Sequence, residues 1–149
     1  MPTKRAIASE LVAELRPAPI TAAWIREGEP VARCATLSNS EDGTATTVLW
    51  DCTEGKFEWI YDFDETIYFL EGRVIIDDGH AGPRQFGPGD VIFFPAGARA
   101  NWHVQEHVKK LAFCRQVLPA PIGFVVSALR FLKRKMRVPS AGVSALSTG

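Results

Sequence analysis

The sequence predicts an all-β fold, a barrel or a sandwich, with a short helix near each end of the chain. Its 149 residues are the usual size of one domain. Twelve glycines and ten prolines separate short apolar runs, and this pattern favours strands joined by turns. Turn signals recur at intervals of roughly 8–12 residues, as they do in sandwiches and barrels. Because 46% of the residues are hydrophobic, the chain is too apolar for a disordered protein.

The first 44 residues are predicted to form an N-terminal extension with the first strand or strands. Within residues 6–16, apolar side chains recur every four positions, as on one face of a short helix (Ile7, Leu11 and Leu15). Pro17 ends this helix. Residues 31–37 are predicted to form a strand, and the polar run 38–44 a turn.

Residues 45–118 are predicted to form the barrel itself. Aromatic side chains at Phe57, Trp59 and Tyr61 alternate with their neighbours, as in a strand with one buried face. Gly72 and Asp78-Gly79 are turn signals between strands. The predicted strands of this region cover residues 45–51, 57–62, 66–70, 73–77, 91–94, 99–105 and 108–118.

The last segment, residues 119–149, is predicted to hold a C-terminal helix and a disordered tail. Pro119 and Pro121 interrupt the β pattern. Residues 122–137 then indicate a helix with an apolar first half and a basic second half. Residues 140–149 are small and polar.

A set of residues spread over the central region carries a family resemblance. The set consists of Trp50, Gly55, Trp59, Tyr61, Asp64-Glu65-Thr66, Tyr68, Leu70-Glu71-Gly72, Gly89-Asp90, Phe94-Pro95, Gly97, Trp102, Val104 and Lys110. In these residues the chain resembles the cupin family, small β-barrels that usually hold a metal among three histidines and a glutamate. The resemblance is closest to the branch that includes the ethanolamine-utilisation cupin and the ureidoglycine aminohydrolase-like cupins, and it implies a jelly-roll barrel of two facing antiparallel sheets.

The resemblance also implies where the metal ligands should stand, and most of them are absent. The positions of the three histidines are occupied by Trp59, Tyr61 and Ala100, and Glu65 alone remains. Since one carboxylate cannot hold a metal tightly, we expect a barrel without metal or other cofactor. A bulge near Ala100 that turns His103 inward would weaken this expectation. A metal held by His103 and His107 on the outer face is a less favoured alternative.

The interior is predicted to be an aromatic pocket for a small molecule. Trp59, Tyr61 and Glu65 share one face, and Ala100 and Trp102 are expected to line the same cavity. Glu65 and Tyr61 are the candidate catalytic residues, because a carboxyl and a phenol can transfer protons. In the alternative, Glu65 is only hydrogen-bonded in place and the tryptophans are core. We favour ligand binding over this structural role, and both over catalysis.

Charge and cysteine content limit the partners and the compartment. The chain has 17 basic and 17 acidic residues, so its formal net charge is zero. It therefore lacks the positive charge that would favour nucleic acid binding. The chain shows no signal peptide and no apolar run near the ~18 residues of a membrane span. Three separated cysteines suggest reduced thiols, so we expect a cytoplasmic protein.

The C-terminal helix raises a separate question, because Arg130, Lys133, Arg134, Lys135 and Arg137 gather at its end. A basic amphipathic helix can lie on an anionic membrane surface. We favour packing of the helix on the barrel or across a homodimer instead.

The function predicted from the sequence is therefore the binding of an unknown small molecule in a metal-free barrel. Two alternatives stay open. One is a hydrolase, isomerase or lyase that depends weakly or not at all on metal; the other is a scaffold or membrane-surface protein.

Overall fold

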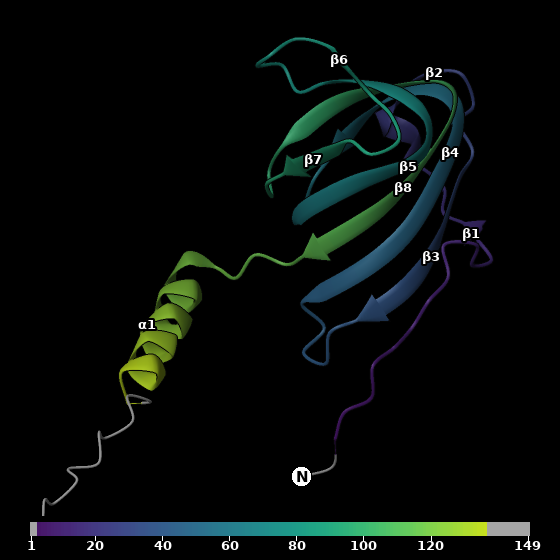
Figure 1. Cartoon of the computed structure of the whole chain (residues 1–149). Helices are drawn as coiled ribbons and strands as arrows, with labels where there is room; N and C mark the ends of the chain where they lie inside the picture. Colours follow the sequence, from purple (N-terminus) through teal and green to yellow (C-terminus); the bar gives the residue numbers. More distant parts are fainter. Residues whose placement is uncertain (1–2, 137–149) are drawn as a thin grey trace, which may run out of the picture. The chain divides into compact units, whose positions relative to one another are not determined.

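The computed structural model describes residues 3–136, and they form one antiparallel β-sheet followed by a helix. The strands of the sheet are arranged in the order β1-β3-β4-β8-β5-β6, with β2 beside β4 and β7 beside β5 (Figure 1). The elements are β1 (Arg16–Pro17), the 3-10 helix η1 (Ala22–Trp24), β2 (Ile25–Glu27), β3 (Ala32–Asn39), β4 (Ala45–Ile60), β5 (Asp64–Asp77), β6 (Arg84–Phe86), β7 (Val91–Phe94), β8 (Arg99–Arg115) and α1 (Ala120–Met136).

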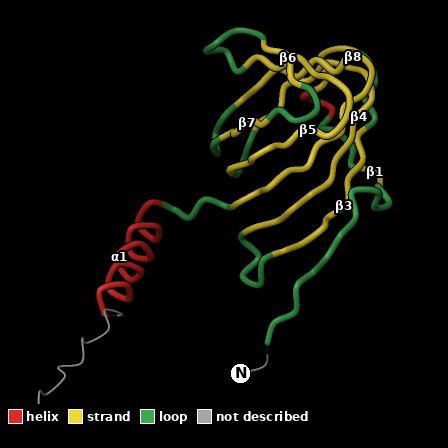
Figure 2. The backbone as a smooth tube through the Cα atoms, in the orientation of Figure 1, coloured by secondary structure: helices red, strands yellow, loops and turns green. Residues whose placement is uncertain are grey.

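Three long strands bend the sheet into a barrel (Figure 2). β4, β5 and β8 have 16, 14 and 17 residues, and the register between them shifts near Gly55 and Gly72. On one side of these shifts, β4 pairs with β3 and β5 pairs with β7. On the other side, β4 pairs with β2 and β5 pairs with β6. The sheet therefore folds over itself into two facing layers. This confirms the predicted all-β barrel.

Each of these long strands was predicted as two shorter ones, and the predicted turn at Gly72 is a bulge inside β5. Gly72 has φ +74°, and a Cβ atom there would lie 1.8 Å from the backbone oxygen of His107. Only glycine allows this close approach of β5 to β8. Sequence patterns mark such a glycine as a chain reversal, whereas here it permits a bend.

The space between the two layers is filled mainly by side chains of the three long strands. They alternate inward and outward along each strand, except at the bulges. The inner set includes Phe57, Phe69, Val74, Trp102, Val104 and Val108, each at most 2% exposed.

The predicted helix over residues 6–16 is wrong. This stretch has no helical residue, and β1 begins at its end, at Arg16. Ile7 and Leu11 are 72% and 46% exposed, so the predicted apolar face is not packed against a core. Since a helix of this length depends on such packing, its spacing alone does not stabilise it.

A second unit begins at Leu118, and within the described residues it contains α1. The helix predicted over residues 122–137 is confirmed as Ala120–Met136. The tail predicted to be disordered, residues 140–149, lies outside the described residues. Within the part of the chain that is described, no helix is long and apolar enough to cross a membrane.

Apolar side chains are exposed on the outer face of the barrel, on β5, β7 and β8. This set comprises Tyr68, Val91, Phe93 and Phe113, each 40–58% exposed. The homodimer expected from the sequence stays a prediction, and this face is the surface on which to test it.

Candidate functional site

An ion pair lies inside the barrel, between Lys110 of β8 and Glu65 of β5. Lys110 Nζ donates a hydrogen bond to Glu65 Oε1 over 2.6 Å, and both residues are 3% exposed. Lys110 pairs with Trp50 on β4 and with Phe69 on β5. Because directly paired residues point to the same side of a sheet, the Lys110 side chain points into the barrel as theirs do. Two charges are thus held in a core that is otherwise largely apolar.

Three tryptophan rings surround the Lys110 ammonium. Nζ lies 4.8 Å from the ring centroid of Trp50, 5.0 Å from that of Trp102 and 5.7 Å from that of Trp59. These distances are within the roughly 6 Å over which a cation is attracted to an aromatic face. Among the described residues, Glu65 is the one hydrogen-bond acceptor for this ammonium. The arrangement is an aromatic cage occupied by the protein's own lysine.

The cage is closed on one side by Trp59 and Trp24. Trp59 is only half-buried, and Trp24 of η1 meets it edge-on at 5.3 Å between ring centroids. Trp24 and Ile25 both pack against the core cluster. The segment that covers Trp59 is short, because η1 and β2 contain three residues each. All four tryptophans of the chain therefore belong to one contiguous cluster.

Tyr61 lies beside the cage and is fully buried. Its hydroxyl oxygen accepts a hydrogen bond from Trp102 Nε1 over 3.1 Å, and its ring stacks on Phe94 at 4.2 Å. Burial, and then the negative charge of Glu65, raise the pKa of Tyr61 well above its ordinary value of 10. The phenol therefore stays protonated at neutral pH, and it is suited to donate a hydrogen bond rather than to act as a base.

Ala100 is buried opposite Trp59, and the strand around it is regular. β8 keeps an unbroken register with β4 from Arg99 to Val104, so no bulge turns His103 inward. His103 is half-buried instead and lines a surface hollow together with Glu27 and Lys56. In residues 3–136 no group of three or more His, Cys, Asp or Glu side chains could hold a metal ion.

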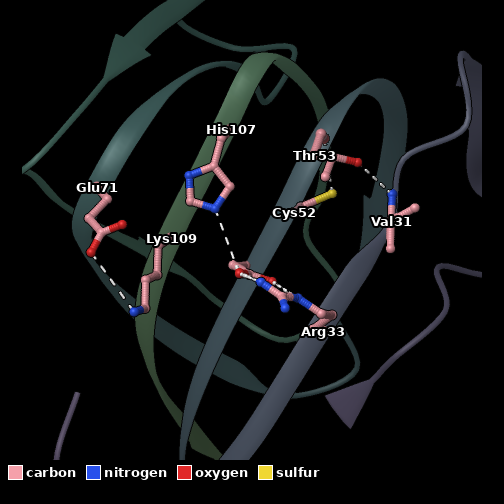
Figure 3. A network of polar contacts seen from close by, with 8 residues as sticks. Val31, Arg33, Cys52, Thr53, Glu71, His107 and Lys109 are labelled. Carbon is pink, nitrogen blue, oxygen red and sulfur yellow. Dashed lines mark hydrogen bonds and ion pairs between the residues drawn. The ribbon is translucent and has the colours of Figure 1, made fainter. Parts of the chain in front are cut away.

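A second polar network covers the outer face of the same strands (Figure 3). Arg33 donates hydrogen bonds to both carboxylate oxygens of Asp51, and His107 Nε2 lies 3.6 Å from that carboxylate. Lys109 Nζ is 3.9 Å from Glu71 Oε1. Lys109 and Lys110 therefore point to opposite sides of β8, and each has its own acidic partner.

The structure brings Trp59, Tyr61, Glu65, Ala100 and Trp102, the five residues singled out in the sequence, to one region of the interior. Except for Trp59, each is at most 3% exposed, so the site is closed. The sequence considerations missed the roles of Lys110, Trp50 and Trp24. The sequence did contain an indication for Lys110, because it lies between Val108 and Ala112 among the alternate residues of β8 that are buried.

Comparisons with known proteins agree with this architecture. The model of the EutQ-like cupin domain family matches residues 39–112. No match is found among curated proteins.

Several solved structures have a similar fold. A protein of unknown function from Pseudomonas syringae pv. tomato has a TM-score of 0.65 at 22% identity over 70% of this chain and 46% of its own. The EutQ protein of Clostridium difficile has a TM-score of 0.52 at 19% identity, over 58% of this chain and 69% of its own. A cupin-like protein from Thermotoga maritima has a TM-score of 0.54 at 16% identity, over 71% and 81%. The chain thus spans less than half of the first of these proteins, and at such identities the likeness concerns the fold alone.

Proposed function

Because the chain belongs to the cupin superfamily, we propose that it binds a small organic molecule inside its barrel, against the Lys110–Glu65 pair. The observation that carries this proposal is the ion pair itself, closed in by three tryptophans. A buried ion pair contributes little net stability compared with apolar side chains of similar volume. Buried ionisable groups in an apolar pocket are, however, typical of binding sites.

The chemistry of the cage favours a ligand with an acceptor oxygen, such as a carboxylate or a carbonyl group. An ammonium has three hydrogen-bond donors, and Glu65 accepts one of them. A ligand oxygen could accept a second, while a flat apolar body packs against Trp59 and Trp24. A cationic ligand is less suitable, since it would have to displace a tethered ammonium whose effective concentration is on the order of millimolar or more.

Access to the site would require η1 to move. Trp24 covers Trp59 from a segment of three residues, and the paired strand β2 is equally short. Short elements with few contacts open at low free-energy cost. We therefore place the route for the ligand between Trp24 and Trp59.

Tryptophan fluorescence can test the proposal directly, because every tryptophan of the chain lies in this cluster. We expect benzoate to change the emission and to raise the melting temperature, and benzylamine to do neither. Lys110→Met should abolish the response to benzoate. The matched control is Lys109→Met, since Lys109 is the preceding residue and faces outward to Glu71.

Two results would count against small-molecule binding at this site. One is the absence of any response in a panel of benzoate, phenylacetate, pyruvate and benzyl alcohol. The other is an equal loss of response in the Lys109→Met and Lys110→Met variants. Trp59→Phe provides an independent variant that keeps the ion pair, and it should weaken the response to benzoate without removing it.

Catalysis by Glu65 and Tyr61 receives less support from the geometry. The raised pKa of Tyr61 keeps its phenol from serving as a base, and Glu65 is engaged with Lys110. Conversion of a bound probe that stops in the Glu65→Gln variant would establish catalysis and would replace the binding proposal.

A further inference from the structure

We infer that helix α1 binds the surface of an anionic phospholipid membrane through one apolar face and the lysines beside it. This inference concerns the unit Leu118–Gly149 and is independent of the barrel interior. It lies outside residues 39–112, which the cupin family model matches.

The first observation is a continuous apolar face along α1. Its members follow one another at intervals of three and four residues, so they share one side of a helix. Each of them is 51–78% exposed. The face consists of Ile122, Val125, Leu129, Leu132 and Met136.

The second observation is the distribution of charge. No aspartate or glutamate occurs after Glu106 in the whole sequence, so α1 carries no acidic residue. At 3.6 residues per turn, Lys133 and Lys135 lie on the two sides of the apolar face. Long lysine side chains in such positions can extend to phosphate groups while the apolar face is buried. The partner that fits this helix is therefore negatively charged and apolar at once.

A lipid surface offers both properties over a large area, as amphipathic helices of this composition require. A second copy of α1 is a poorer partner. The apolar spacing spans fewer than three heptads, and the residues beside it in the last turns are lysines, which repel one another in a parallel pair. Nucleic acid would attract the lysines but would leave the apolar face in water. Phe124 and Phe131 are also exposed, at 76% and 66%, but at 3.6 residues per turn they lie beyond Lys135 and outside the apolar face.

Co-sedimentation of the full chain with vesicles tests this inference. We expect binding to vesicles of phosphatidylcholine with phosphatidylglycerol, weak binding to phosphatidylcholine alone, and loss of binding at high salt. The variant Lys133→Gln/Lys135→Gln should bind roughly 25-fold more weakly, at about fivefold for each charge removed. Leu129→Gln/Leu132→Gln should lose binding as well.

The matched control is Lys109→Gln/Arg115→Gln, which removes two positive charges from the barrel strand β8. It should bind as well as the wild type, to within about a factor of two. The inference is overturned if the full chain does not bind anionic vesicles at low salt, or if this control loses as much affinity as the helix variant. It is also overturned if the Leu129→Gln/Leu132→Gln variant still binds, because the charges alone would then account for the attraction.

A contact between proteins gives a different result. In that case the wild type does not bind vesicles, and Leu129→Gln/Leu132→Gln dissociates an oligomer that sedimentation equilibrium detects in the wild type. Helix α1 then binds another chain, and the lipid inference fails.

Discussion

Removal of the Lys110 ammonium is the sharpest test of the barrel interior. In Lys110→Met the side-chain volume is nearly kept, but Glu65 loses its hydrogen-bond donor in a site that is 3% exposed. Removing one partner of a buried ion pair costs about 3–5 kcal/mol, because an uncompensated charge remains. A single domain has about 5–15 kcal/mol of unfolding free energy in total. The variant should therefore lose a large part of its stability.

Urea unfolding followed by tryptophan fluorescence measures this loss. With a slope of about 1.5 kcal/mol per molar urea, the midpoint should fall by about 2–3 M. The double variant Lys110→Met/Glu65→Leu should recover much of the stability, since apolar side chains can replace a buried pair at little cost. The cycle built from both single variants then gives the coupling between the two residues.

Arg115→Met is the control, because Arg115 and Asp64 form an ion pair across the same two strands, β8 and β5, at the surface. Exposed ion pairs contribute little, so its midpoint should barely change. If Lys110→Met shifts the midpoint no more than Arg115→Met, the pair is not desolvated and the description of a closed cage is wrong. A double variant less stable than both single variants would refute the reasoning in the same way.

Three further predictions follow from the glycine, thiol and carboxylate environments. Gly72→Ala should abolish soluble expression, since its Cβ would overlap the backbone of β8. Gly43, at φ +71°, lies in open space, so Gly43→Ala should fold and lower the melting temperature only modestly. Equal yields of the two soluble variants would contradict this. Burial raises the pKa of the Cys52 thiol to about 12, so about one molecule in 10⁴ is thiolate at pH 8, and Cys52 should resist Ellman's reagent until urea unfolds the chain. Hydrogen bonds from Ser40 and Thr44 lower the pKa of Asp42 from 3.8 to about 2, so its stabilising effect is present above pH 4 and lost as the pH falls toward 2. Asp42→Ala should remove that part of the pH dependence of the melting temperature, and a variant curve parallel to that of the wild type would exclude it.

The alternation of side chains was enough to predict which residues face the interior. Trp59, Tyr61 and Glu65 follow one another at even spacing across a short connection, and the structure places all three inside. Alternation with a period of two shows on which face of a strand a residue lies. It does not show whether the strand continues through a bend. For this reason each of β4, β5 and β8 was predicted as two strands, with a turn at Gly72 in β5, although bulges at Gly55 and Gly72 keep the strands continuous.

The partner of Glu65 could not be predicted by the same means. Lys110 is 45 positions away from Glu65 in the sequence, and the two meet only when β8 pairs with β5. A lysine within an alternating strand is usually interpreted as exposed, because burying its charge alone is costly. The ion pair removes that objection. It also places a fixed positive charge beside Glu65, the one residue retained from the ligand set that the family resemblance implies, while the absence of a metal stays a prediction.

The order of strands in the sheet has a consequence for how the protein reaches its folded state. β8 is the last strand to be synthesised, yet it lies between β4 and β5 and pairs with both along most of its length. From Ile60 to Arg115 the ribosome adds 55 residues, which takes about 3–11 s at typical rates of translation. During this interval β4, and β5 once it has been made, present an edge of unpaired backbone groups, on which another nascent chain could pair. We therefore expect slow folding, and a yield that depends on how crowded the newly made chains are.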